Sequence, residues 1–150
     1  MSNVLIRKAT VKDMQAVHDL VRELAIYEKA EEQVKTSAAD FVKDGFEDDP
    51  AFGCYVAEVD GQVIGFALYY IRYSTWNGKV LYLEDLLVTE DYRGIGIGKL
   101  LFEKMIELGR SMGFRDLNWQ VLDWNEPAIN FYRKYDVILD PEWINGKIVL

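Results

Sequence analysis

Two adjacent carboxylates interrupt an apolar stretch near the middle of the chain. Glu84 and Asp85 stand between the apolar runs 80–83 and 86–88. Neighbouring residues of a strand point to opposite faces of a sheet, so at least one of these carboxylates must lie where a charge is costly. A charge in such a place usually has a partner or a chemical task. The alternative is that both lie at a solvated strand edge, where charges block unwanted strand pairing.

A glycine-rich turn follows this predicted strand. Residues 93–99 read Arg-Gly-Ile-Gly-Ile-Gly-Lys and stand just before a predicted helix. Glycines let the backbone bend tightly and point several N–H groups at an anion, and Arg93 and Lys99 add positive charge. The turn is therefore predicted to bind phosphate, the alternative being a flexible connection.

The spacing of the residues in the turn limits which class of phosphate-containing ligand it can bind. A P-loop has four residues between its first glycine and its Gly-Lys pair, and a Ser or Thr directly after that pair, whereas this chain has Arg93 and Leu100 at these two positions. No magnesium-bound nucleoside triphosphate is expected. A dinucleotide site would follow the first strand of a parallel sheet, with an acidic residue about 20 positions on. Here the turn follows a predicted meander, and Asn118 stands near that position.

The elements that must position these residues are predicted from hydrophobic periodicity and turn signals. They are a strand at 4–9, a helix at 10–28, a shorter helix at 37–45, a three-stranded antiparallel meander at 54–88 with turns at Asp60-Gly61 and Asn77-Gly78, a helix after Gly98, a strand at 117–121, a helix opening at Asn125 and a pair of short strands within 137–150. In the helix after the glycine turn, four side chains are expected to face the core: Leu100, Leu101, Met105 and Leu108.

Composition sets outer limits on function. With 150 residues the chain fits one domain, 1–150, and its net charge of -8 makes nucleic acid an unexpected partner. The single cysteine, Cys54, lies in an apolar run and is expected to be a buried structural thiol. No targeting segment or membrane-length apolar run is evident, so a cytoplasmic protein without a membrane partner is expected. No His, Cys or carboxylate spacing indicates a metal site.

Several segments, in order along the chain, resemble one known superfamily. The glycine turn is similar to the acetyl-CoA signature of the GNAT superfamily. The more specific resemblance is to the spermidine/spermine acetyltransferases and their diamine- and thialysine-acetylating relatives. It rests on Glu23-Leu24-Ala25-x-Tyr27-Glu28, Glu31-Glu32-Gln33-Val34, Leu81-Tyr82-Leu83-Glu84-Asp85, Tyr92-Arg93-Gly94-x-Gly96-Ile97-Gly98 and Trp124-Asn125-Glu126-Pro127-x-Ile129-Asn130-Phe131-Tyr132. The resemblance implies an α/β (α+β) GNAT fold, with a mixed, mostly antiparallel sheet of six to seven strands, about four helices and a splay at the acetyl-CoA site.

The resemblance also implies the site residues. The backbone of the strand would pair with the pantetheine arm, the turn would hold the pyrophosphate, and the start of the last helix would line the other side of the channel. The implied cofactor residues are Leu86, Leu87, Val88, Arg93, Gly94, Ile95, Gly96, Ile97, Gly98, Lys99, Asn125, Glu126, Pro127, Ala128 and Tyr132. The implied acceptor residues are Tyr27, Glu28 and Glu84, with Asp85 and Trp76 as further candidates.

Acetyl transfer to an amine needs a base and an acid. An aliphatic amine has a pKa of about 10, so at neutral pH it arrives protonated and cannot attack a thioester. Glu84 would take that proton through an ordered water, or mainly hold the ammonium group. Tyr132 would return a proton to the CoA thiolate, across a pKa gap of roughly 1.5 units that costs about 2 kcal/mol. Without the resemblance, Tyr132 could equally be one more core aromatic beside Phe131 and Tyr135.

Other acceptors and a non-enzymatic role remain as alternatives. The expected activity is acetyl transfer from acetyl-CoA to a polyamine, diamine or thialysine-like amine, and the rivals are an aminoglycoside, a protein amino group, or a non-catalytic acyl-CoA sensor. The resemblance implies a homodimer. Two departures concern the end of the chain: Tyr135-Asp136 stands where the family usually has a glycine, and Glu142 is the nearest match to an acidic acceptor residue.

Overall fold

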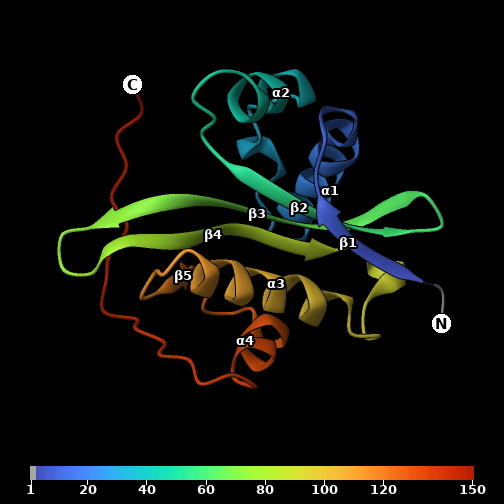
Figure 1. Ribbon diagram of the computed structural model, residues 1–150. Helices are drawn as coiled ribbons and strands as arrows, with labels where there is room; N and C mark the ends of the chain where they lie inside the picture. The colour runs from blue at the N-terminus through green and yellow to red at the C-terminus, as the bar shows by residue number, and fades with distance from the viewer. Residues whose placement is uncertain (1–2) are drawn as a thin grey trace. The chain divides into compact units, whose positions relative to one another are not determined.

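The computed structural model describes residues 3–150, which form two compact units, one ending at Trp119 and the other running from Gln120 to Leu150. The first unit is built on one sheet whose strand order follows the chain (Figure 1). Its strands are β1 (Val4–Lys8), β2 (Gly53–Val59), β3 (Gln62–Ser74), β4 (Gly78–Val88) and β5 (Leu117–Trp119). The first four strands are antiparallel neighbours, and β5 is parallel to β4.

Tight turns make the meander from β2 to β4. Asp60 and Gly61 both adopt positive φ, at 50° and 77°, as a two-residue hairpin turn requires. Gly78, at φ 78°, ends the turn between β3 and β4. The predicted three-stranded antiparallel meander is confirmed, with both turns at the predicted dipeptides.

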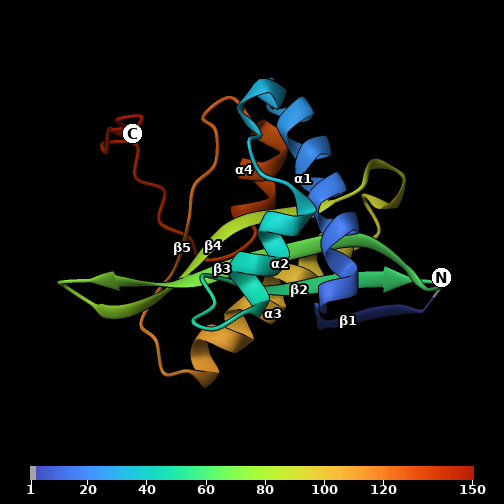
Figure 2. The ribbon, with the colours of Figure 1, turned by 90° about the horizontal axis from the view of Figure 1, so that it is seen from above.

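Two helices cover one face of the sheet. They are α1 (Met14–Tyr27) and α2 (Ala38–Phe46), which lie on the same side of it (Figures 1 and 2). A capping box between Thr10 and Asp13 opens the short helical turn that leads into α1. The core on this side contains Ala9, Met14, Val17, Leu20, Cys54, Val56, Phe66, Leu68 and Leu87. Burial raises the pKa of the Cys54 thiol to about 12, which fits the expected structural role.

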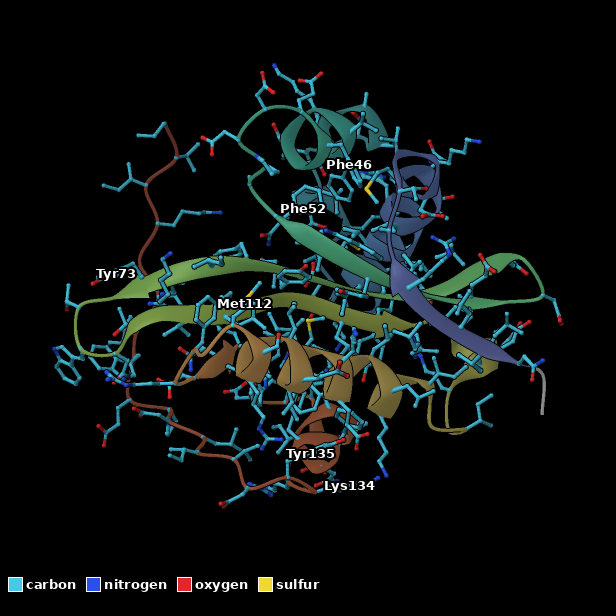
Figure 3. All side chains as sticks on the ribbon, viewed as in Figure 1. Phe46, Phe52, Tyr73, Met112, Lys134 and Tyr135 are labelled. Carbon is cyan, nitrogen blue, oxygen red and sulfur yellow. The ribbon has the colours of Figure 1, made fainter. Side chains whose placement is uncertain are left out.

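The helix α2 extends one residue past its predicted end at Gly45. A Cβ at Gly45 would lie 2.3 Å from the ring of Phe52, so the glycine makes room for that ring rather than stopping the helix. Figure 3 shows Phe52 near Phe46 beneath this end of α2.

A third helix, α3 (Ile97–Ser111), covers the opposite face of the sheet (Figure 1). Its buried side chains are Ile97, Leu101, Phe102 and Met105. Leu101 and Met105 face the core as predicted, and Leu108 is half-buried. The prediction for Leu100 is wrong. Its side chain is 42% exposed, because it lies outside the buried stripe by which α3 packs against the sheet.

The second unit contains one helix, α4 (Glu126–Tyr132), and an extended tail. Asn125 is the N-cap, and its side chain accepts a hydrogen bond from the Ala128 backbone at 3.3 Å. The predicted pair of strands within 137–150 is wrong, because this segment forms no regular structure. The predicted strand at 117–121 is shortened to β5. The sheet therefore has five strands among the described residues, where the resemblance implied six to seven, and the mixed GNAT fold with four α-helices is confirmed.

Candidate active site

One edge of β4 loses its partner halfway along the strand. The pairing of β5 with β4 runs only from Leu81 to Leu83, and beyond Leu83 the only partner of β4 among residues 3–150 is β3. The Thr89 N–H donates to the Ile64 carbonyl of β3 at 2.8 Å. Because alternate residues of an antiparallel strand face the partner, Leu87 also faces β3, whereas Leu86 and Val88 turn their N–H and C=O groups to the other edge. This is the splay that the sequence resemblance implied.

The glycine turn follows this edge. Gly94 and Gly96 have φ values of 79° and 91°, which non-glycine residues rarely adopt, and the space around a Cβ at either position is open. Gly96 caps the N-terminus of α3, and the helical hydrogen bonds begin when the Leu100 N–H donates to the Gly96 carbonyl at 3.1 Å. The preceding N–H groups of the first turn have no partner within the helix, so this end of α3 is suited to an anion.

The two cationic side chains that flank the turn are both paired with glutamates. Arg93 donates from Nε to the Val88 carbonyl at 2.6 Å and from Nη2 to Glu23 at 3.0 Å. Lys99 is exposed and lies 3.9 Å from Glu103, one helical turn further on. Sequence reasoning missed the role of Glu23, although it stands in one of the quoted segments, because its partners are 66 and 70 residues away.

A bulge separates the two carboxylates of β4. Leu83 is opposite Tyr69 and Asp85 is opposite Leu68, so Glu84 is an extra residue without a partner on β3. Such a bulge breaks the strict alternation of side chains and re-aims those beside it. Glu84 is exposed and accepts a hydrogen bond from the Tyr70 hydroxyl at 3.3 Å.

Asp85 is the carboxylate in the costly setting. Burial, together with the charges of Glu84 and Glu28, raises the pKa of Asp85 to about 7. Burial also raises the pKa of Glu28, which is the residue after α1. The expectation that one of the two adjacent carboxylates lies where charge is costly is therefore confirmed for Asp85. The charges of Glu84, on β4, and of Glu28, directly after α1, therefore both act on Asp85.

The remaining acceptor candidates lie at different places. Tyr27, the last residue of α1, has its ring 5.9 Å from the guanidinium carbon of Arg93. Trp76 lies in the turn between β3 and β4 and is 86% exposed. Glu84 lies six residues along β4 from Gly78, the first residue of the strand, a span of roughly 20 Å. The structure does not bring Trp76 to the carboxylates.

The second unit holds the other predicted site residues. Glu126 and Pro127 open α4, in the first turn where proline is tolerated. Tyr132, the last residue of α4, is buried, and its ring centroid lies 5.3 Å from that of Phe131. Glu142 is exposed, and its N–H donates to the Asp140 side chain at 3.0 Å.

Metal-binding clusters and membrane-spanning helices are both absent from the described residues, 3–150. That part of the chain contains no group of three or more His, Cys, Asp or Glu side chains placed to hold a metal ion. It also contains no helix that is long and apolar enough to cross a membrane.

The sequence matches the family model described as the acetyltransferase (GNAT) family over residues 14–136. A thialysine N-epsilon-acetyltransferase of Sus scrofa is 41% identical over 141 residues, which cover 89% of this chain and 83% of the relative. A human spermidine/spermine N(1)-acetyltransferase-like protein 1 is 38% identical, over 85% of this chain and 19% of the relative. A solved aminoglycoside N-acetyltransferase in complex with CoA has the same fold, with a TM-score of 0.78, 21% identity and coverage of 99% and 96%.

These similarities and the fold define the class of the protein. The chain belongs to the GNAT acetyltransferase family. Within that family it is an N-acetyltransferase similar to the thialysine and polyamine acetyltransferases.

Proposed function

We propose that this enzyme transfers the acetyl group of acetyl-CoA directly to a primary amine of a small cationic acceptor, of the polyamine, diamine or thialysine-like class. The observation that carries the proposal is that the charges of Glu28 and Glu84 both act on Asp85, and that Glu84 and Asp85 lie in the part of β4 that does not pair with β5. An electronegative site beside a donor channel suits an acceptor with more than one positive nitrogen. The relatives that are named for thialysine and spermidine acetylation support the same class.

The residues of the first unit fit acetyl-CoA in two ways. Leu86 presents its N–H and C=O groups, and Val88 its N–H, at the edge of β4 that does not pair with β5, as a pantetheine arm requires. The turn from Gly94 to Lys99 and the N-terminus of α3 present N–H groups suited to a pyrophosphate. When bound, acetyl-CoA would supply the activated acetyl group. By the family resemblance, residues 125–128 would line the other side of the channel.

The acceptor must lose a proton before it can react. An ordinary carboxylate has a pKa of about 4 and is a weak base toward an ammonium group of pKa about 10. Asp85, with a pKa of about 7, is better matched by roughly three units. We therefore assign proton removal to Asp85, directly or through a water, and the holding of the ammonium to Glu84 and Glu28. Of the two roles expected for Glu84 from sequence, proton removal through a water or mainly the holding of the ammonium, this proposal keeps the second.

A second proton transfer concerns the leaving group, the thiolate of CoA. As the amine nitrogen forms its bond to the carbonyl carbon, the carbon–sulfur bond breaks and the thiolate needs a proton. Tyr132 would donate it, and the phenol would regain a proton from solvent. A phenol of pKa about 10 suits a thiolate whose acid has a pKa of about 8.5.

The test is turnover of acetyl-CoA, followed as release of free thiol, with spermidine, spermine, putrescine, thialysine, lysine and an aminoglycoside as acceptors. We expect turnover with a polyamine, a diamine or thialysine, and a slower rate in Tyr132→Phe. Binding of acetyl-CoA without thiol release for any amine would contradict the proposal and favour a protein acceptor or a sensor. Turnover with the aminoglycoside alone would place the acceptor in a different class.

Three broader assignments belong to the same proposal. We propose a cytoplasmic homodimer, as the family resemblance implies. We also propose that residues 1–150 act as one domain, because the family match at 14–136 spans both compact units. Light scattering of the purified protein at several concentrations tests the dimer.

A further inference from the structure

One glutamate of α1 connects to both sides of the segment that leads into the glycine turn. The Thr89 hydroxyl donates to Glu23 Oε1 at 2.7 Å, and Arg93 Nη2 donates to Glu23 Oε2 at 3.0 Å. Thr89 follows the last residue of β4, and Arg93 directly precedes Gly94. Both carboxylate oxygens of Glu23 are therefore used on the same loop.

Arg93 is held at three points. Besides its bond to Glu23, its Nε donates to the Val88 carbonyl at 2.6 Å, and its guanidinium lies over the ring of Tyr27 at 5.9 Å. The side chain thus lies against the end of β4 and the end of α1. The cation that precedes the turn is fixed by the protein's own groups.

The turn itself has little packing to define its position. Residues 93–96 are exposed, and no atom lies within 4 Å of a Cβ built at Gly94 or Gly96. One end of the turn is anchored by Ile97, the first residue of α3, whose side chain is buried in the core and only 1% exposed. At the other end, backbone hydrogen bonds of the short helical turn Glu90–Tyr92 hold the chain as far as the Arg93 N–H, and the side-chain hydrogen bonds there are those that join Arg93, Thr89 and Glu23.

We propose that Glu23 is a positioning residue for the donor: it clamps Arg93 and Thr89, and so fixes the orientation of the glycine turn toward the pyrophosphate of acetyl-CoA. This inference rests on the proposed function of the turn. It assigns the Arg93 guanidinium to holding the turn rather than to contacting phosphate. It also leaves the Val88 N–H and the Leu86 backbone groups for the pantetheine arm, because the Val88 carbonyl already has a donor.

The test compares Glu23→Gln and Thr89→Val with Glu107→Gln, which breaks an exposed ion pair on α3 to Lys104. We expect the KM for acetyl-CoA to rise about tenfold in Glu23→Gln and less in Thr89→Val, with kcat and the KM for the amine nearly unchanged. In Glu107→Gln none of these constants should change. Melting temperatures close to that of the wild type would show that the split between KM and kcat does not reflect unfolding.

A double variant tests the connection itself. If Glu23 acts through Arg93, then Glu23→Gln combined with Arg93→Gln should raise the KM for acetyl-CoA no more than the larger single change. Additive effects would overturn the inference, as would an unchanged or lower KM in Glu23→Gln, since a released Arg93 would then be free to bind phosphate.

Calorimetric titration of acetyl-CoA separates this inference from the proposed function. Equal binding by wild type and Glu23→Gln would overturn only the role of Glu23. No binding by the wild type would overturn both.

Discussion

The guanidinium of Arg7 donates to both carboxylate oxygens of Asp13, from Nη1 at 2.8 Å and from Nη2 at 2.9 Å. Arg7 also donates to Glu58 on the neighbouring strand, at 3.1 Å from Nε. Asp13 in turn accepts a hydrogen bond from the Thr10 N–H at 2.7 Å. This network fixes the start of α1 to the first two strands of the sheet.

The first prediction concerns the stability that this pair contributes. The hydrogen bond from Arg7 lowers the pKa of Asp13 to about 2, against an ordinary value near 3.8. A lowered folded-state pKa stabilises the protein above the ordinary pKa and loses this effect as the pH falls toward 2. We expect Asp13→Asn to lower the free energy of unfolding by about 2 kcal/mol at pH 7, and the difference from wild type to shrink between pH 4 and pH 2.

Urea unfolding at pH 7, 4 and 3 measures this difference. Asp19→Asn is the matched control, because Asp19 is exposed on α1 and its side chain bonds only to Gln15 among the described hydrogen bonds. A constant difference between Asp13→Asn and wild type from pH 7 to pH 3 would show that the carboxylate charge contributes nothing.

The second prediction concerns the pH dependence of the rate. If Asp85 removes the proton of the amine, the reactive form has an ionised Asp85, so kcat/KM for the acceptor should rise with pH through about 7. Asp85→Asn should remove this rise and slow the reaction by roughly 10²–10⁴-fold.

Glu84→Gln provides the informative comparison for Asp85→Asn. The charge of Glu84 raises the pKa of Asp85, so its removal should keep the rise in rate but move it to lower pH. If Glu84→Gln abolished the rise instead, Glu84 would be the base and our assignment would be reversed.

The third prediction concerns stability at the same carboxylate. The raised pKa of Asp85 means that the folded state holds its proton more tightly than the unfolded state does. The stability from this group is full below about pH 4 and is lost as the pH rises to about 7. At pH 8, Asp85→Asn should therefore be more stable than the wild type and unfold at a higher urea concentration. The expected gain in the free energy of unfolding is about 2 kcal/mol, after allowance for the solvent that still reaches the side chain. If the difference in urea midpoint between Asp85→Asn and the wild type were the same at pH 5 as at pH 8, this prediction would be contradicted.

Sequence patterns located most of the fold because the signals were local. The period of α1, the turn at Asp60-Gly61 and the glycines before α3 each depend on residues close together in the chain, and the structure confirms them. The pair of strands predicted within 137–150 had one turn signal, the dipeptide Asn145-Gly146, and no such strands form. Leu100 was misplaced because an apolar residue beside a buried stripe carries no sign of its own exposure.

The candidate site likewise has features that a local sequence signal predicts and features that it does not. The carboxylates and the glycine turn stood out because their residue types are unusual for their surroundings. Which of the two adjacent carboxylates has the raised pKa depends first on burial next to the bulge at Glu84, and then on nearby charges that include Glu28, which lies 57 residues before Asp85 in the chain. The bonds from Glu23 to Thr89 and Arg93 likewise join distant segments. Neither relationship has a local signal in the sequence.

The last prediction concerns the glycine turn. Gly96 has a φ of 91° and open space around its Cα, so Gly96→Ala should meet no steric clash yet still strain the backbone by about 1–2 kcal/mol. Gly61 is a matched control, because its φ of 77° and open surroundings are similar but it lies in the turn between β2 and β3. Both variants should lose comparable stability in urea unfolding. Only Gly96→Ala should raise the KM for acetyl-CoA, because a strained turn no longer presents its N–H groups in the orientation that the pyrophosphate needs. An equal rise in Gly61→Ala would trace the effect to general destabilisation, and no rise in Gly96→Ala would remove the turn from the donor site.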